Sequence, residues 1–335
     1  MTTCSLEAIG LGAVHVDHIY TVEQILHDGE CVVTESASFP GGSGANTIHG
    51  LSRLGLKCGF IGAVGNDSDG NLLIKDFENA GIDNQYLMVT DEAQTGSVVS
   101  LSESSGRRST YVNPGANNYL NLSDINLEYL SQAKLVHMST FFSQNEFALC
   151  HEIAERLAPD VLFSFSPGAL FAAQGLKRLA PILSRTNALF TNQLDIEKMT
   201  QKNYQRATDM CIRSGCEHVV VTLGESRRFQ RKGKITLQTY IRDKDHECHM
   251  ESTVSLRKDI RTVVDTIGAA DAFTTGFLFG LMGDKPIEEC GLLGDISARF
   301  CISKLGARSG LPNLEGLKER SACTILLTDF LPLEE

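Results

Sequence analysis

The 335-residue sequence contains no long uninterrupted apolar run. A membrane-spanning helix needs roughly 18 or more consecutive apolar residues, and no segment reaches that length. The first residues, MTTCSLEAIGLGAV, also lack the basic flank and the apolar stretch of a secretory signal peptide. We therefore expect a cytoplasmic protein with no membrane partner.

The sequence also has a deficit of positive charge. Lys and Arg number 30 against 41 Asp and Glu, which gives a formal net charge of -11. Nucleic acids and anionic membranes would repel such a chain, so neither is expected as a partner. A phosphorylated ligand would have to be bound by local positive potential, which the backbone N–H groups at a helix N-terminus supply without a net charge.

Two further signatures are missing. The ten cysteines include no CxxC pair, and several lie in apolar strings, which favours buried reduced thiols over a disulfide framework. The first apolar run continues as GLGAVHVD and lacks the GxGxxG turn into a helix that binds dinucleotides. This argues against an oxidoreductase that uses a dinucleotide.

The order of patterns along the chain predicts an α/β fold. Short apolar runs alternate with helical spacing, which is typical of a doubly wound, mostly parallel sheet with helices on both faces. Two half-polar alternating stretches, about 15–40 and 95–114, do not fit that sheet and are expected to form a small β-sheet lid over its carboxyl edge. We predict a single domain over 1–335, with one helix near 170–184 and a loop over 242–259.

The stretch DTIGAADAF, residues 265–273, raises the main chemical question. Gly268 and the two following alanines allow a tight turn into a helix whose first N–H groups stay free to bind an anion. Asp271 would lie in the first turn of that helix. It is either an ordinary helix-start aspartate or the base that takes a hydroxyl proton during phosphoryl transfer, and the stretch alone leaves both readings open.

Four other stretches stand in a definite order before this one. GGSGANTIHGLSRLG and GAVGNDSDG lie in the N-terminal half, TNQLD and VVVTLGE lie in the middle, and DTIGAADAFTTGFLFGL follows. With these motifs the sequence resembles the ribokinase-like (PfkB) sugar and nucleoside kinases over nearly its whole length. The run EECGLLGDISARFCISKLGARSGLP is more similar to the archaeal-type nucleoside kinases of that family. The resemblance implies an ATP-dependent kinase with a ribokinase-like fold.

The resemblance implies roles for the residues that handle the acceptor. Asp271 would be the catalytic base, and the amides of Gly268, Ala269 and Ala270 would contact the transferring phosphoryl group. Substrate contacts are expected from Asp17, Gly42, Asn46, Phe141 and Arg108. Carboxylate and amide groups suit sugar diols, which both donate and accept hydrogen bonds, whereas Phe141 suits a flat apolar group. A solvated strand residue, a helix-start amide and a solvated hairpin tip are the structural alternatives for Asp17, Asn46 and Arg108.

The resemblance also implies a nucleotide and cation site. Asn192 and Asp195 would organise Mg²⁺ through water, because Mg²⁺ prefers oxygen ligands and keeps several waters; helix capping is the alternative. Thr222 and Gly224 would line the ATP site, although Gly224 could serve only a turn. Asp265 would anchor a monovalent cation such as K⁺, or else shape the end of a strand.

The sequence departs from the family pattern at three of these places. Ala270 replaces a glycine, which is tolerable if its φ is negative, and Asp195 replaces a longer Glu. Ser43 stands where ribokinases tend to carry Lys. Ser43, the apolar Phe141 and the run similar to archaeal-type nucleoside kinases favour a nucleoside as substrate, with a free sugar or a sugar phosphate as alternatives and an inactive binding protein as a remote one. Open strand edges in the lid predict a homodimer.

Overall fold

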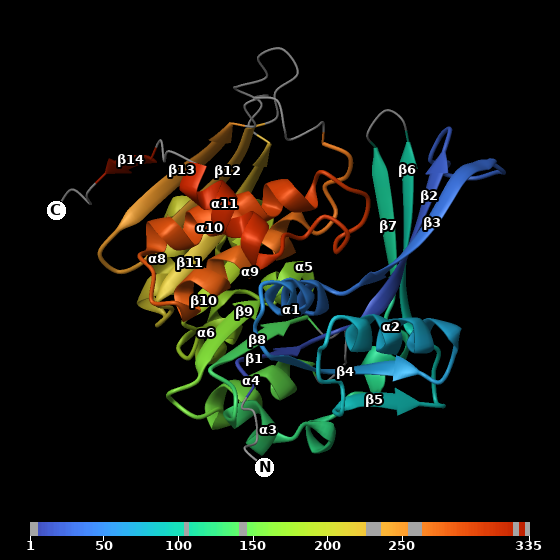
Figure 1. Ribbon diagram of the computed structural model, residues 1–335, viewed down its shortest axis with the longest axis horizontal. Helices are drawn as coiled ribbons and strands as arrows, with labels where there is room; N and C mark the ends of the chain where they lie inside the picture. Colours follow the sequence, from blue (N-terminus) through green and yellow to red (C-terminus); the bar gives the residue numbers. More distant parts are fainter. Residues whose placement is uncertain are drawn as a thin grey trace.

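The computed structural model describes residues 6–103, 107–140, 146–225, 236–253, 263–323 and 328–331. They form a large sheet of ten strands covered by helices, and a separate sheet of four strands that projects from this body (Figure 1). The large sheet runs in the order β14 (Thr328–Leu331), β13 (Glu247–Thr253), β12 (Thr236–Arg242), β11 (His218–Glu225), β10 (Ala188–Asn192), β9 (Leu162–Ser166), β8 (Leu135–Ser139), β1 (Ala8–Leu11), β4 (Cys58–Gly65) and β5 (Leu87–Thr90).

The strands from β11 to β5 are all parallel, whereas β12, β13 and β14 continue the sheet in antiparallel pairing. A parallel strand is buried on both faces, and its residues are therefore apolar or small along its whole length. β1 and β4 show this: every residue of both strands is buried. The predicted class, a doubly wound and mostly parallel sheet, is confirmed.

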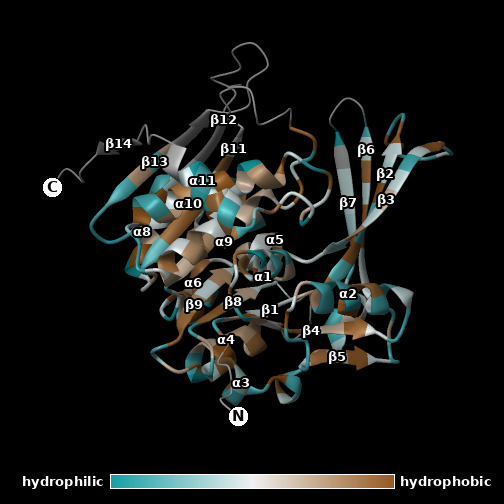
Figure 2. Ribbon diagram, viewed as in Figure 1, coloured by the Kyte–Doolittle hydropathy of each residue, from teal (hydrophilic) through white to brown (hydrophobic). Residues whose placement is uncertain are grey.

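Helices cover both faces of the large sheet, with their apolar sides turned inward (Figure 2). One face carries α3 (Leu127–Ser131), α4 (Glu146–Arg156), α5 (Gly168–Ala172), α6 (Leu176–Leu183), α7 (Gln193–Thr200) and α8 (Tyr204–Arg213). The other face carries α1 (Ser43–Arg53), α2 (Ser68–Asn79), α9 (Ala269–Met282), α10 (Ile287–Cys301) and α11 (Leu314–Cys323). Two short 3₁₀ helices, η1 (Gly115–Tyr119) and η2 (Leu122–Asp124), lie between β7 and α3.

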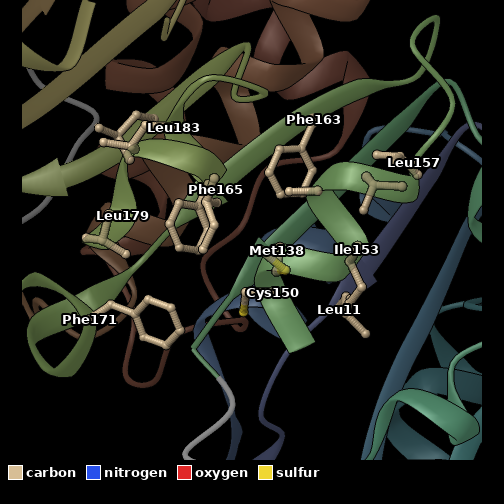
Figure 3. Close-up of a cluster of buried hydrophobic side chains, with 14 of the residues drawn as sticks. Leu11, Met138, Cys150, Ile153, Leu157, Phe163, Phe165, Phe171, Leu179 and Leu183 are labelled. Atoms are coloured by element: carbon tan, nitrogen blue, oxygen red, sulfur yellow. The ribbon is translucent and has the colours of Figure 1, made fainter. Parts of the chain in front are cut away.

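The core on the α3–α8 face is drawn in Figure 3. Phe163 and Phe165 alternate along β9 on this face and meet side chains from α4, α5 and α6. Phe165 packs edge-on against Phe171 of α5, with ring centroids 5.8 Å apart. This packing fixes the helices that follow each strand, and so it fixes the loops at the carboxyl ends of the strands.

The small sheet has the order β3 (Val33–Gly41), β2 (His15–Val22), β6 (Gly96–Glu103) and β7 (Arg108–Asn113). β2 pairs with β3 in antiparallel register and with β6 in parallel register. Asp17 lies opposite Phe39 and Val98, so the three residues share one face of the sheet. The predicted second sheet is confirmed, and we call it the lid.

Two local predictions were wrong. The expected single helix near 170–184 is divided into α5 and α6, because Gly175 between them has a φ of 82° and cannot continue a helix. The predicted loop over 242–259 contains β13, in which Cys248 and Met250 face the core while His249 is exposed. This alternation was present in the sequence but was obscured by the charged residues around it. Among the described residues, no helix combines the length and apolar character needed to cross a membrane.

Candidate active site at the carboxyl ends of the strands

A cavity of about 150 Å³ lies where the parallel strands of the large sheet end. β9 contributes Ser166, β10 contributes Asn192 and β11 contributes Thr222, and the first turns of α1 and α9 close the cavity. This is the edge at which doubly wound sheets bind ligands. The cavity brings together several residues that the sequence predicted to form one site.

Asp271 enters this cavity from the first turn of α9. The helix begins after Gly268, whose φ of 76° is left-handed and whose absent Cβ would lie 2.5 Å from the Cβ of Ala307. Only glycine satisfies both conditions at that turn. No side chain in the described part of the chain caps the N-terminus of α9, which leaves its early N–H groups and the positive end of the helix dipole beside the cavity.

The two alanines of the predicted anion site differ in their environment. Ala270 is exposed, lines the cavity and lies within the helix, so its methyl group is compatible with its backbone conformation. The Ala269 N–H donates to the Thr266 carbonyl at 3.3 Å, so this amide is shared with the loop. The replacement of the family's glycine by Ala270 therefore leaves the backbone path of the loop intact.

Two hydrogen bonds hold the Asp271 carboxylate. The Ser43 hydroxyl donates to Oδ1 at 2.7 Å, and the Asn46 side-chain amide donates to Oδ2 at 2.8 Å. Both donors belong to α1, which packs side by side with α9 (Figure 1). The carboxylate thus stands in one orientation, with its oxygens beside the cavity.

The pKa of Asp271 is raised above its ordinary value, mainly because burial removes hydration from the charged form. The hydrogen bonds from Asn46 and Ser43 lower this pKa, the nearby charge of Asp17 raises it, and the charge of Arg308 lowers it. Burial prevails over the opposing contributions. A carboxylate with a raised pKa is a stronger proton acceptor, which suits a general base.

Asp17 reaches the same region from the lid. Its Oδ1 lies 3.2 Å from the Nε2 of His15 on the same strand. Gly41 makes room for it, since a Cβ on Gly41 would lie 2.5 Å from the Asp17 Oδ2. The next residue, Gly42, has a φ of 102° and precedes α1, where a Cβ would lie 2.4 Å from the Ala13 carbonyl oxygen. The two glycines bring the lid strand and α1 close to Asp271.

Asn192 and Asp195 lie together at the start of α7, on the far side of the cavity. The Asn192 Oδ1 caps the helix by accepting the Asp195 N–H at 2.8 Å, and the Asn192 Nδ2 donates to the Asp195 Oδ2 at 2.7 Å. The capping alternative is therefore observed, and both residues also line the cavity. Burial raises the pKa of Asp195. No cluster of three or more His, Cys, Asp or Glu side chains suited to a metal occurs in the described ranges.

Thr222 and Gly224 lie at the end of β11. Thr222 lines the cavity, and its hydroxyl donates to the Thr191 carbonyl at 3.4 Å. Gly224 has a φ of 72° at a bulge in the pairing with β12, and it lies outside the cavity lining. Of this predicted pair, Thr222 faces the site directly, and Gly224 turns the chain.

Asp265 is separate from this chemistry. Its Oδ1 accepts the Ile267 N–H at 3.0 Å, and its Oδ2 accepts the Gly306 N–H at 3.0 Å. The carboxylate therefore ties the loop before α9 to the loop after α10. This is the structural alternative considered for Asp265. Phe141 lies outside the described residues, as does the side chain of Arg108, whose backbone begins β7.

Sequence reasoning missed two residues that contact this network. Ser43 was noted as a departure from the family pattern, but its bond to Asp271 could not be inferred because the two residues are 228 positions apart. Arg308, in GARSGLP, is buried at 7% exposure and donates to Asn46. A charged residue within an otherwise small and apolar run was the available signal.

Comparison with known proteins yields one family and a consistent set of relatives. Residues 6–314 match the pfkB family of carbohydrate kinases. An uncharacterized sugar kinase of Archaeoglobus fulgidus is 34% identical over 78% of this chain and 98% of its own length. A nucleoside kinase of Methanocaldococcus jannaschii is 26% identical over 92% of this chain and 95% of its own. The crystal structure of a ribokinase from Thermotoga maritima is 25% identical, has a TM-score of 0.78 and covers 95% of this chain and 99% of its own. The family resemblance predicted from the motifs is confirmed.

Proposed function

The chain belongs to the pfkB family of carbohydrate kinases, and we propose that it transfers the γ-phosphoryl group of ATP to a primary hydroxyl of a ribose-containing substrate, with a nucleoside as the acceptor. It is a phosphotransferase that uses an alcohol group as acceptor. The placement of Asp271 supports the reaction most directly. This half-buried carboxylate is oriented by Ser43 and Asn46 at the uncapped N-terminus of α9.

The proposed reaction moves one proton and one phosphoryl group. The Asp271 carboxylate takes the proton of the acceptor hydroxyl as that oxygen forms a bond to the γ-phosphorus. The bond from the γ-phosphorus to the β,γ-bridging oxygen breaks, and ADP leaves with that oxygen. Backbone N–H groups of Gly268, Ala270 and Asp271 stabilise the charge on the transferring group, with Ala269 contributing to the extent that its N–H leaves Thr266.

The nucleotide is assigned to the β10 and β11 side of the cavity, with Asn192 and Thr222 as contacts and Gly224 at the turn beyond. Asn192 and Asp195 would hold Mg²⁺ through water, and their oxygens fit this role since the Asp195 Oδ1 has no hydrogen bond within the described part of the chain. When bound, Mg²⁺ neutralises charge on the phosphates. We also propose that a K⁺ ion binds near Asp265. The Asp265 carboxylate shapes the loop before α9.

The inner face of the lid favours a nucleoside over a free sugar. Beside Asp17, a cavity of about 420 Å³ is lined by Ile19, Thr21, Glu35, Ser36, Ala37, Phe39 and Leu305. An apolar wall with one carboxylate fits a flat base whose exocyclic N–H groups need an acceptor. Asp17, Gly42 and Asn46 would then hold the ribose, and the single domain 1–335 would close its lid segments, about 15–40 and 95–114, over the bound nucleoside.

A coupled assay of ADP release tests the reaction and the acceptor class. The purified chain is supplied with ATP and Mg²⁺, and with ribose, fructose, fructose 6-phosphate, adenosine, inosine, guanosine or cytidine in turn. We expect the highest kcat/KM for a nucleoside. Selective turnover of fructose 6-phosphate or of a free sugar would overturn the acceptor class. Folded protein that releases no ADP with any acceptor would overturn the kinase activity.

We also propose a homodimer formed through the lid, in a reducing cytoplasm. The lid's outer strands carry exposed apolar side chains at Val33, Tyr111 and Val112, and seven of the eight cysteines whose burial the structure describes are buried. Light scattering should give twice the monomer mass of 36.5 kDa. Tyr111→Lys should shift the mass to that of a monomer, whereas a wild-type monomer at assay concentrations would refute the dimer.

A further inference from the structure

Arg308 links three separate elements near the catalytic base. It lies in the loop between α10 and α11, with 7% of its surface exposed. Its Nε donates to the Asn46 Oδ1 at 2.9 Å, and one terminal nitrogen donates to the Gly41 carbonyl oxygen at 2.9 Å. The other terminal nitrogen pairs with Asp76 of α2. The guanidinium also lies over the Phe77 ring, 5.7 Å from its centroid.

The bond to Asn46 determines which way that amide points. A guanidinium can only donate hydrogen bonds, so the oxygen of the Asn46 amide must face Arg308. The amide nitrogen must then face Asp271, where it donates to Oδ2 at 2.8 Å. Arg308 therefore acts on the base through Asn46 without touching it.

The bond to Gly41 reaches the lid. Gly41 is the last residue of β3, and it lies opposite His15 of β2. A Cβ on Gly41 would collide with the Asp17 carboxylate, so Arg308 holds the strand end directly beside the predicted sugar contact. Asp76 balances the buried guanidinium charge from α2 and leaves the other donors free for Asn46 and Gly41.

We propose that Arg308 is a positioning residue of this kinase: it turns the Asn46 amide toward Asp271 and fixes the end of lid strand β3, so that the base and the sugar-binding strand keep one relative geometry. Its planar, forked set of donors makes the three bonds from fixed directions, which a lysine cannot do. This role rests on the proposed phosphoryl transfer.

The pKa of Asp271 distinguishes a positioning role for Arg308 from a purely structural one, because it depends on the charges around the carboxylate. Asp17 on the lid and Arg308 act on its pKa in opposite directions, and Cys301 of α10 senses its charge. Around Arg308, Asp76 is its ion-pair partner, and burial together with Arg308 lowers the pKa of His49 to about 4, so His49 is neutral at pH 7. Because the Arg308 cation lowers the pKa of Asp271, its removal raises that pKa further.

Two variants of Arg308 test the role through kcat, KM and the pH profile. Arg308→Gln should lower kcat by about 10²-fold, the loss typical of a misplaced reacting geometry, with the KM for ATP unchanged. The acid limb of its kcat/KM profile should move to higher pH. Arg308→Lys should also lower kcat but keep the acid limb near the wild-type position, since it keeps the charge; it also serves if the Gln variant fails to fold.

Arg299→Gln is the matched control. Arg299 is a mostly buried arginine of α10, paired with Asp295 at 2.7 Å, and it is not among the residues that line the cavity. Its replacement should reduce stability without moving the acid limb. In a double-mutant cycle, Arg308→Gln should have little further effect on kcat in the Asn46→Ala background. Full additivity of the two losses would overturn the route through Asn46.

The coupling between Arg308 and Asp271 can also be measured without any kinase activity. Carbon-13 NMR of labelled aspartate, with Asp271→Asn to assign the signal, follows the Asp271 carboxyl directly. We expect its titration to move to higher pH in Arg308→Gln and to stay in place in Arg299→Gln. If wild-type protein phosphorylates no acceptor, the proposed function fails, and this titration still decides the coupling. A folded Arg308→Gln protein with an unchanged Asp271 titration refutes it, as does one with wild-type kcat.

Discussion

At the scale of single residues, Asp271 experiences opposing influences on its acidity. Burial raises its pKa, the hydrogen bonds from Asn46 and Ser43 lower it, and the neighbouring charges of Asp17 and Arg308 act against each other. A proton acceptor must be ionised to work, so the rate of phosphoryl transfer should depend on this balance.

The acid limb of the pH profile measures that balance. Asp271 must be deprotonated, and its raised pKa means that kcat/KM should begin to fall at a higher pH than an ordinary aspartate, near about 3.9, would produce. In Asp17→Asn the acid limb should move to lower pH, since one nearby negative charge is removed. A limb in the ordinary carboxyl range, or one that Asp17→Asn leaves in place, would contradict this assignment.

The sequence singled out Asp271 as a candidate base, but it did not predict the hydrogen bonds that hold it. Asp271 lies in a motif with a local physical meaning, a glycine turn into a helix start. Ser43 and Arg308 are separated from their contacts by 228 and 262 positions. Nothing local encodes such contacts, because they arise only when α1 and the loop after α10 pack against α9.

At the scale of elements, the start of α9 depends on Gly268. The residue combines a left-handed φ with a close approach to Ala307, whereas Gly81 after α2 has a φ of 68° and, its chain neighbours aside, no atom of the described residues within 4 Å of its missing Cβ. A side chain at Gly81 would therefore cause backbone strain alone, whereas a side chain at Gly268 would cause both backbone strain and steric overlap.

Gly268→Ala should destabilise the protein more than Gly81→Ala. We expect Gly81→Ala to lower the free energy of unfolding by about 1 kcal/mol through backbone strain, and Gly268→Ala to lower it by at least about 2 kcal/mol because overpacking adds to that strain. Gly268→Ala should also reduce kcat. Urea denaturation provides the comparison, and equal losses for the two variants would show that the approach to Ala307 does not constrain the turn.

The root of the lid is held by the buried side chain of Asn117. Its Oδ1 accepts the Val14 N–H at 3.0 Å, and its Nδ2 donates to the carbonyl oxygens of Val14 and Pro114 at 2.9 and 2.8 Å. Val14 precedes β2 and Pro114 follows β7, so one amide joins the first and last strands of the lid where they leave the body.

Asn117→Ala should loosen this root. Buried backbone groups would lose their partners, so we expect the free energy of unfolding to fall by at least about 2 kcal/mol and the KM for the acceptor to rise while the KM for ATP stays unchanged. Asn66→Ala, which removes an exposed bond to Asp91, is the control and should change stability by no more than about 0.5 kcal/mol. Similar losses of unfolding free energy in both variants would show that Asn117 does not hold the lid strands together.

Helices and strands could be predicted where the apolar residues followed a single regular spacing, either that of a helix or that of a strand. The sequence indicated β1 and β4 because every residue of these strands is buried and apolar or small. It indicated α1 because buried apolar residues recur on successive turns of that helix. β13 was missed because its alternation spans few residues within a charged run. The break between α5 and α6 was missed because it depends on the conformation of Gly175 alone.

At the scale of the whole molecule, the arrangement of two sheets determines the site. The large sheet supplies Asn192 and Thr222 from strand ends, α9 supplies Asp271, and α1 supplies the Ser43 and Asn46 donors to its carboxylate. The lid brings Asp17 and its apolar inner face over the same edge. The sequence predicted both sheets and five of these residues, Asp17, Asn46, Asp271, Asn192 and Thr222, but not Ser43. It could not predict which lid residues contact the body, because those contacts join residues that are distant in the chain.

Turnover of Asp271→Asn shows whether Asp271 is the base of an ATP-dependent kinase. Asp284→Asn, at an exposed turn after α9, is the matched control. With the best acceptor from the ADP-release assay, kcat of Asp271→Asn should fall by about 10²–10⁴-fold, with an unchanged melting temperature and KM for ATP, while Asp284→Asn keeps wild-type turnover. A folded Asp271→Asn protein with near-normal kcat would show that Asp271 is not the base.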